Sequence, residues 1–280
     1  MKRILFLTIS CFLLISTTPI FAATPPASRT LILYAFDAEG DAIAKFMITD
    51  SSYVFLGRHV YLGEWCGQKI ILAESGMGMT NAAMTTQMLI DRFHPRTVLF
   101  TGIAGAIDTS IHIGDIVIPS RWCEHDYGYY GKDGLKPEGL VVHLFGADSL
   151  TEETAFYADS SLLEIARKIP LDSLDLAPIN GRTPRLTIGG VGVTGNQFID
   201  SKEEREWQTK HFGPLTTDME SVAVAQVCAV NGVPFLIIRS ASDLAGGSGS
   251  STAQTEIKQF FKVAAANSID VLRQLLWLMN

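Results

Sequence analysis

Three acidic residues stand where their carboxylates can act on one small molecule: Glu39, Glu220 and Asp243. Glu39 and Asp243 follow apolar runs typical of buried strands, and Glu220 lies at the start of a helical pattern. Ligands of α/β sheets bind outside the carboxyl ends of the strands, so the three side chains can converge there. Like charges in a partly dry pocket move pKa values apart, which allows one carboxylate to act as a base and another as an acid. Each residue alone also fits a structural role, as a helix-start acid or a loop cap.

Two glycine-rich turns follow predicted strands and can bring the backbone close to a ligand. They span Ser75–Gly78 and Thr101–Gly105, and turns of this kind point N–H groups at a bound molecule. The first turn departs from the dinucleotide-binding fingerprint, because Asn81 replaces its third small residue. The chain also has no Walker-type phosphate loop. The turns therefore predict a small-molecule site that uses neither phosphate motif.

Short apolar runs alternate with helical patterns, and these elements must position the polar residues. The expected strands cover 31–36, 69–73, 97–100, 115–118, 185–193 and 234–238. Several of these runs are continuous rather than alternating, as in strands that are buried on both faces of a sheet. The expected helices cover 81–93, 150–168, 200–211, 220–230 and 254–278. The pattern predicts an α/β fold with a largely parallel sheet.

The start of the chain has the pattern of an export signal. A basic start, an apolar run over 4–15 and small residues up to Ala22 predict a signal peptide over residues 1–22. The run is too short to span a bilayer. We therefore expect an exported protein, periplasmic or secreted, whose mature part over residues 23–280 is one domain.

Composition excludes several classes of partner. Removal of Lys2 and Arg3 with the signal peptide changes the formal net charge from −7 to −9, and no basic cluster remains. An acidic chain of this kind is not expected to bind nucleic acid or a membrane surface. Cys66, Cys123 and Cys228 do not have the spacing of a metal site. Cys228 is interpreted as a buried small hydrophobe, and a Cys66–Cys123 disulfide stays open.

Taken in order, the motifs resemble the 5′-methylthioadenosine/S-adenosylhomocysteine nucleosidases of the nucleoside phosphorylase superfamily. The similarity covers about residues 31–276, and its most specific parts are 75–78, 101–106 with 114–117, 194–199, 218–220 and 239–243. The resemblance implies a single-domain three-layer αβα sandwich with a central twisted, mostly parallel mixed sheet. It also implies a purine nucleoside substrate, no cofactor, no metal and a homodimer. The apolar Met77, Met79 and Met84 around the first glycine turn add to the expectation of a dimer.

The resemblance further implies roles on the sugar side of the substrate. Glu39 aligns with the carboxylate that activates the attacking water, and Arg239 would help to hold that water. Glu220 would accept hydrogen bonds from the 2′ and 3′ hydroxyls of the ribose. Met219 would also bind the sugar, and Asp218 is a further substrate-binding residue.

On the base side, Asp243 aligns with the acid that protonates purine N7, and Ser242 would orient it. Phe198 would stack on the base, and Ile199 would contact its edge through backbone groups. Further substrate-binding residues implied by the resemblance are Met77, Ala104 and Gly105. Cleavage of an N-glycosidic bond places positive charge on the sugar and negative charge on the leaving purine, so a proton donor and a carboxylate suit the reaction.

The absence of arginine from two turns favours water over phosphate as the nucleophile. Phosphorylases need arginines for phosphate, and the turns over 34–39 and 101–105 contain none. We therefore expect hydrolysis of purine nucleosides such as 5′-methylthioadenosine, S-adenosylhomocysteine or adenosine, with release of adenine. The alternatives are a phosphate-dependent phosphorylase and a non-catalytic exported nucleoside-binding protein.

The 5′ side of the substrate is where the chain departs from the family. Residues 246–251 are glycine and serine only, and they contain no match for the aromatic residue that closes the 5′ pocket in the family. We interpret this segment as a mobile flap, with a plain surface loop as the alternative. The expected consequence is a smaller preference for methylthioadenosine over adenosine.

Overall fold

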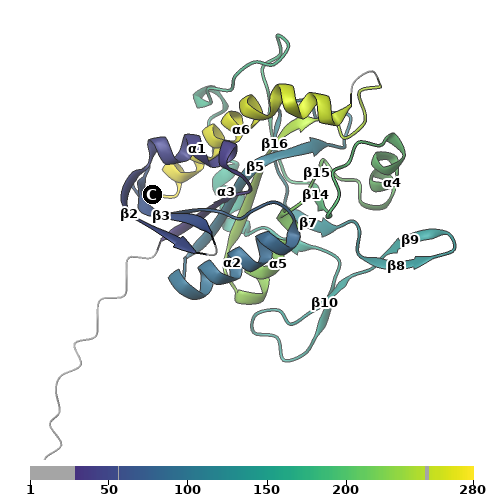
Figure 1. Ribbon diagram of the computed structural model, residues 1–280, viewed down its shortest axis with the longest axis horizontal. Coiled ribbons are helices and arrows are strands. Elements are labelled where there is room, and N and C mark those ends of the chain that lie inside the picture. Colours follow the sequence, from purple (N-terminus) through teal and green to yellow (C-terminus); the bar gives the residue numbers. More distant parts are fainter. Residues whose placement is uncertain (1–28, 56, 250–251) are drawn as a thin grey trace, which may run out of the picture.

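The computed structural model describes residues 29–55, 57–249 and 252–280. The predicted signal peptide and Ser250–Ser251 of the expected flap therefore lie outside the described residues. A mixed sheet forms the centre of the molecule, and helices cover both of its faces (Figure 1). This arrangement confirms the predicted α/β sandwich with a mostly parallel sheet.

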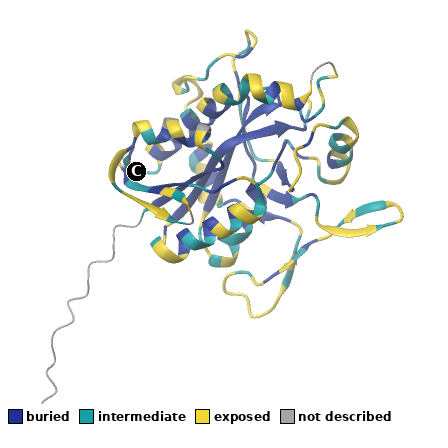
Figure 2. Ribbon diagram, viewed as in Figure 1, coloured by how far each residue is buried: buried dark blue, intermediate teal, exposed yellow. Residues whose placement is uncertain are grey.

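Four parallel strands form the middle of the sheet. Their order is β4 (Gln68–Glu74), β1 (Thr30–Tyr34), β5 (Thr97–Ala106) and β16 (Phe235–Asp243). All residues of β1, β5 and β16 are buried, as their continuous apolar runs predict. Figure 2 shows this central sheet as the main buried layer. The carboxyl ends of these strands consequently meet at one edge.

Shorter strands extend the sheet on both sides. On one side, β3 (Arg58–Trp65) and β2 (Ile48–Phe55) continue from β4 as an antiparallel pair. On the other side, the order continues from β5 through β15 (Thr216–Asp218), β14 (Val191–Thr194), β7 (Arg121–Glu124) and β12 (Phe156–Tyr157). A branch from β16 adds β6 (Ile116–Ile118) and β13 (Leu186–Ile188). The small hairpins are β8 (Gly128–Gly131) with β9 (Gly134–Pro137), and β10 (Leu140–Val142) with β11 (Thr151–Glu153).

Two groups of helices cover the sheet. α6 (Ala253–Leu278) packs on β16 and β5 and contacts α1 (Asp37–Phe46) and α3 (Ser160–Ala166). α2 (Met79–Phe93) and α5 (Ser221–Asn231) pack together on the opposite side (Figure 1). α4 (Lys202–Phe212) lies at the periphery, and a short 3₁₀ helix spans Leu171–Ser173. None of the helices in the described part of the chain is both long and apolar enough to cross a membrane.

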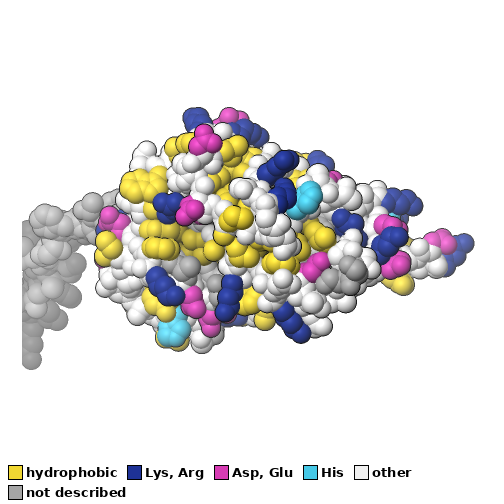
Figure 3. Space-filling model, turned by 90° about the horizontal axis from the view of Figure 1, so that it is seen from above, with side chains coloured by type: hydrophobic (Ala, Val, Ile, Leu, Met, Phe, Trp, Pro, Cys, Tyr) yellow, Lys and Arg dark blue, Asp and Glu magenta, His cyan; other side chains and the backbone are white. Residues whose placement is uncertain are grey.

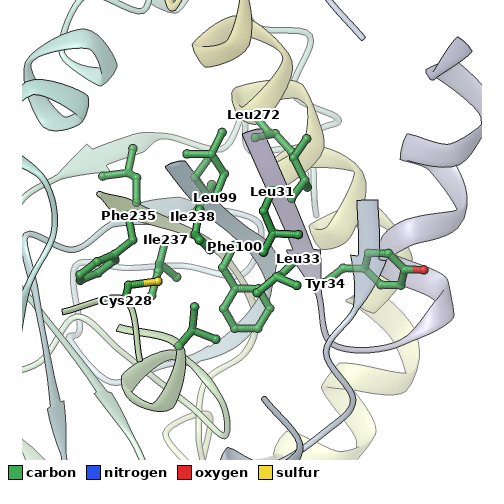
Figure 4. Close-up of a cluster of buried hydrophobic side chains, with 14 of the residues drawn as sticks. Leu31, Leu33, Tyr34, Leu99, Phe100, Cys228, Phe235, Ile237, Ile238 and Leu272 are labelled. Carbon is green, nitrogen blue, oxygen red and sulfur yellow. The ribbon is translucent and has the colours of Figure 1, made fainter. Parts of the chain in front are cut away.

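The apolar core joins the sheet to both layers of helices. Side chains of β1, β5 and β16 meet Cys228 of α5 and Leu272 of α6 in one cluster (Figure 4). Cys228 is fully buried, as predicted, and burial raises the pKa of its thiol. Cys66 and Cys123 are both free thiols, so the disulfide left open by the sequence does not form.

Four predicted elements are wrong in their bounds: the strands expected over 97–100 and 234–238 extend to Ala106 and Asp243 as β5 and β16, and two other elements differ more. The expected strand over 185–193 is two strands, β13 and β14, because Gly189 and Gly190 turn the chain with φ of 107° and 75°. The expected helix over 150–168 holds only α3, and β11 and β12 precede it. The residue before α3 is Asp159, and its side chain accepts a hydrogen bond from the Leu162 N–H and so caps the helix.

Candidate active site

A cavity of about 130 Å³ opens at the carboxyl ends of the central strands. The ends of β5, β15 and β16 form its floor, the segment after β1 forms one wall, and Ile257 of α6 lies on its rim. A smaller adjoining cavity extends past Gln197, Phe198 and Ile199. Every site residue predicted from the sequence, except Arg239, lines one of the two cavities: Glu39, Met77, Ala104, Gly105, Phe198, Ile199, Asp218, Met219, Glu220, Ser242 and Asp243.

Glu39 lies in the first turn of α1 with its carboxylate held by backbone amides. Oε2 accepts a hydrogen bond of 2.6 Å from the Ala35 N–H, and Oε1 accepts one of 2.8 Å from the Ile103 N–H. The side chain is 2% exposed, and this burial raises the pKa of Glu39, while the charge of Arg239 and the amides oppose the rise. The result is a fixed carboxylate with increased basicity.

Arg239 lies fully buried on β16 behind the cavity rather than in its wall. Its Nε donates to Asp218 Oδ2 at 2.7 Å, Nη2 donates to Ser221 Oγ at 3.0 Å, and the guanidinium stacks 3.9 Å from the Phe100 ring centroid. Nη1 has no hydrogen-bond partner among the described residues. A β-carbon on Gly102 would lie 2.3 Å from this Nη1 and 2.4 Å from Glu39 Oε1. Nη1 and the Glu39 carboxylate therefore share the space above Gly102.

Asp218 joins several elements of the site through hydrogen bonds and an ion pair. Its carboxylate also accepts hydrogen bonds from Thr194 Oγ1 at 2.6 Å and from the N–H and hydroxyl of Ser221. The Asp218–Arg239 ion pair is almost fully buried, so removal of either partner would leave an uncompensated charge. These contacts fix the start of α5 against β14 and β16.

Glu220 is the residue before α5 and lies at the edge of the cavity. Its Oε1 accepts a hydrogen bond of 2.7 Å from the N–H of Gly78, in the first glycine turn. Gly78 has a φ of 85°, which explains the glycine here. Burial raises the pKa of Glu220 to about 7, the negative charge of Asp218 adds to the rise, and Arg239 opposes it. The second carboxylate oxygen, Oε2, has no hydrogen bond among those between described residues.

Asp243 ends β16 as a buried carboxyl group. Its Oδ2 accepts a hydrogen bond of 2.8 Å from Ser242 Oγ, and its Oδ1 accepts one of 2.9 Å from the Ala245 N–H. Burial raises the pKa of Asp243 to about 6, although both hydrogen bonds lower it. A β-carbon on Gly105 would lie 2.9 Å from Oδ1, so the second glycine turn leaves room for this carboxyl. Asp243 consequently keeps its proton to a higher pH than an exposed aspartate, and about a tenth of it is protonated at pH 7.

Two apolar residues of the cavity escaped the sequence analysis. Phe36 is the residue before α1, and Ile257 lies in the second turn of α6. Both pack with Ile103 in one cluster. Their only signal in the sequence was apolar character next to Glu39 and after the glycine–serine segment, which is also typical of core residues.

The segment that carries Phe198 is fixed by residues with no recognisable motif. Asp126 Oδ2 accepts a hydrogen bond of 2.8 Å from the Asn196 N–H, and the His125 N–H donates to Thr194 O at 2.9 Å. Asn196 Oδ1 in turn accepts a hydrogen bond of 3.2 Å from the N–H of Met79, at the start of α2. This hydrogen bond therefore links the loop that carries Phe198 to the first glycine turn. Among the described residues, no group of three or more His, Cys, Asp or Glu side chains could hold a metal ion.

Comparisons with known proteins agree with this geometry. The family model of the phosphorylase superfamily matches residues 30–276. A 5′-methylthioadenosine/S-adenosylhomocysteine nucleosidase of Mycobacterium tuberculosis is 35% identical over 222 residues, 76% of this chain and 83% of that protein. A nucleosidase of this name from Neisseria meningitidis, solved with methylthio-immucillin-A, has a TM-score of 0.72 at 27% identity and covers 89% of this chain and 99% of its own. Another from Colwellia psychrerythraea, solved with adenine, has a TM-score of 0.73 at 26% identity and covers 90% and 95%.

Proposed function

The chain belongs to the 5′-methylthioadenosine/S-adenosylhomocysteine nucleosidases of the phosphorylase superfamily, and we propose that its buried carboxyl groups perform that reaction. The reaction is hydrolysis of the N-glycosidic bond of a purine nucleoside, with release of adenine. One observation carries the assignment of residues. Glu39 and Asp243 line the same cavity, both are 2% exposed, and hydrogen bonds fix each carboxyl group.

Asp243 is the proton donor to purine N7. The carboxyl keeps its proton to a higher pH than an exposed aspartate because burial raises its pKa to about 6. Transfer of its proton neutralises the negative charge that develops on the purine as the glycosidic bond breaks. Phe198, which is 46% exposed at the neighbouring wall, offers a ring on which the base can stack.

Glu39 is the base that activates water. A water beside its carboxylate attacks the anomeric carbon, and Glu39 takes the proton that the water loses. Arg239 Nη1 lies over the same glycine and helps to hold this water. Glu220 accepts hydrogen bonds from the ribose hydroxyls, since its Oε1 is fixed by Gly78 and its side chain lines the cavity. The charged form of Glu220, whose pKa is raised to about 7, stabilises the positive charge that develops on the sugar.

The cavity favours water over phosphate. Its lining contains no arginine or lysine among the described residues, and Arg239 is engaged by Asp218 behind the wall. A phosphate ion there would face Glu39 and Glu220 without a cation to balance its charge. Hydrolysis is therefore preferred over phosphorolysis.

The 5′ substituent faces an apolar wall. The sequence offers no aromatic residue for this side in 246–251, and we propose that Phe36 and Ile257, which line the cavity, form this wall instead. We propose that this wall accepts an alkylthio group, as in methylthioadenosine. Contact with a small apolar group gives a preference of about 10- to 200-fold over the unsubstituted nucleoside.

The homodimer and export remain proposals. Met77 and Met84 are 64% and 46% exposed, and hydrophobic side chains form a broad band on the face shown in Figure 3. Exposed apolar surface of this kind is typical of contact sites between subunits. Light scattering at micromolar concentration should give twice the mass of the mature chain, and fractionation of the producing cells should find it outside the cytoplasm.

An assay of adenine release tests the proposed function. The mature chain is incubated with methylthioadenosine, S-adenosylhomocysteine or adenosine, with and without phosphate. We expect release of adenine that does not depend on phosphate, and its loss in D243N with substrate binding retained. A requirement for phosphate would indicate a phosphorylase, and binding without turnover would indicate an exported binding protein.

A further inference from the structure

The first turns of α6 contain a buried carboxylate that the proposed reaction does not use. Glu256 is 7% exposed, and its Oε2 accepts a hydrogen bond of 2.9 Å from the N–H of Leu244. Leu244 is the residue that follows Asp243. Burial of a carboxylate costs free energy unless hydrogen bonds or charges compensate for it. The position of Glu256 next to the proposed acid therefore suggests a role in the site.

The chain after Asp243 forms a tight turn, and Glu256 binds this turn at the N–H of Leu244. Ala245 has a φ of 49°, in the left-handed region that residues with a β-carbon rarely adopt. In this conformation its N–H donates to Asp243 Oδ1. The Gly247 N–H closes the turn by donating to Leu244 O at 2.8 Å. Glu256 thus fixes the peptide directly before the amide that orients the acid.

We propose that Glu256 is a positioning residue for Asp243, which anchors this turn to α6 and places a negative charge near the acid that favours its protonated form. The proposal rests on the proposed role of Asp243 as the proton donor. The start of α6 is itself firmly held, because Thr252 Oγ1 and Asp200 Oδ1 accept hydrogen bonds from the N–H groups of Thr255 and Ala253. The N-terminus of a helix also stabilises a negative charge such as that of Glu256.

The charges around Asp243 agree with this role. Burial is the main cause of its raised pKa, and the negative charges of Glu256 on α6 and Asp200 before α4 add to it. Glu39 and Glu220 lie along the same cavity. The guanidinium of Arg205 on α4 lies beyond the turn, where a β-carbon on Gly247 would lie 2.7 Å from its Cζ. Among the hydrogen bonds between described residues, that of Glu256 is the one that joins a carboxylate of this group to the turn.

The test is the pH profile of kcat/KM for methylthioadenosine with E256Q. Glutamine keeps the shape and an oxygen that can accept the Leu244 hydrogen bond, but it removes the charge. The alkaline limb, which reports the proton on Asp243, should move down by about 0.5 to 1 pH unit. The activity lost above that limb should therefore be about 3- to 10-fold, whereas the rate at pH 5 should stay close to wild type. The matched control is E206Q on α4, whose carboxylate is 67% exposed and should leave the limb in place.

A second variant separates the charge from the anchor. E256A removes the hydrogen bond as well, so kcat should fall at every pH in addition to the shift of the limb. An E256Q limb at the wild-type position would overturn the proposal, and so would a uniform loss of activity without a shift, which is the mark of a purely structural residue. If E256A does not fold, the pH profile of the isosteric E256Q still tests the proposal. Failure of the proposed function is distinguishable, since D243N would then keep its activity whatever E256Q does.

Discussion

Replacement of Gly102 by alanine should remove most of the activity from a protein that still folds. The new β-carbon would lie 2.3 Å from Arg239 Nη1 and 2.4 Å from Glu39 Oε1, whereas ordinary contacts begin at 3.4 Å. Both groups would have to retreat by about 1 Å, and a displacement of that size in an active site costs about 10²-fold in rate. Gly102 does not have a left-handed φ, so the backbone accepts alanine and the effect comes from contact alone.

The assay compares kcat/KM and thermal unfolding of G102A with those of G192A. A β-carbon on Gly192 would lie 2.5 Å from the Trp122 ring, so G192A overpacks a buried position that does not line the cavity. Overpacking costs about 1–3 kcal/mol, and both variants should melt a few degrees lower. Only G102A should lose about 10²-fold in kcat/KM. A G102A enzyme with kcat/KM within about threefold of wild type would refute the placement of Glu39 and Arg239 in the reaction.

Three further predictions concern single side chains of the cavity. E39Q should lower the rate of adenine release by about 10²- to 10⁴-fold, because an amide is too weak a base for water; an active E39Q would remove Glu39 from the mechanism. I257S should reduce the preference for methylthioadenosine over adenosine, measured as a ratio of kcat/KM, and I257L should keep it. The melting temperature of D243N should be higher than that of wild type at pH 8 and equal to it at pH 4. A raised pKa means that the folded state binds the proton more tightly than the unfolded state does. The stability of wild type therefore falls as pH rises from about 4 through 6, whereas asparagine does not titrate and the variant is not destabilised in this way. Equal melting temperatures at pH 8 would contradict the raised pKa.

The strands that carry the site were predictable because their burial is visible in the sequence. β1, β5 and β16 are buried along their whole length, and each contains a continuous apolar run: 31–33 in β1, 98–100 in β5 and 235–238 in β16. β2 was not predicted, because as an edge strand it exposes most of its residues and contains Asp50, Ser51 and Ser52. α1 was also missed, since Gly40 interrupts a weak apolar pattern. Gly40 is required there for a tertiary reason, as a β-carbon would lie 2.3 Å from the Tyr34 ring.

The residues of the site were predictable from their motifs, but their contacts were not. The resemblance identified Arg239 as a residue near the water, but no motif indicated that Asp218 and Ser221 would bind its Nε and Nη2. The role of Asp126 was also invisible, because its hydrogen bond with Asn196 joins positions 70 residues apart. Long-range hydrogen bonds of this kind depend on the completed fold.

The division of charge among the acids explains how the site can hold both a base and an acid. Asp218 engages the buried Arg239 through its Nε, so the cation is only partly available to the other carboxyl groups. Glu39, Glu220 and Asp243 then remain in a cavity with no lysine or arginine in its described lining, and burial raises the pKa of each. Hydrogen bonds oppose the rise at both Glu39 and Asp243, but the neighbouring charges differ in sign: Arg239 lies near Glu39, whereas Glu256 and Asp200 lie near Asp243. The cation favours the charged form that a base requires, and the carboxylates favour the protonated form that a proton donor requires.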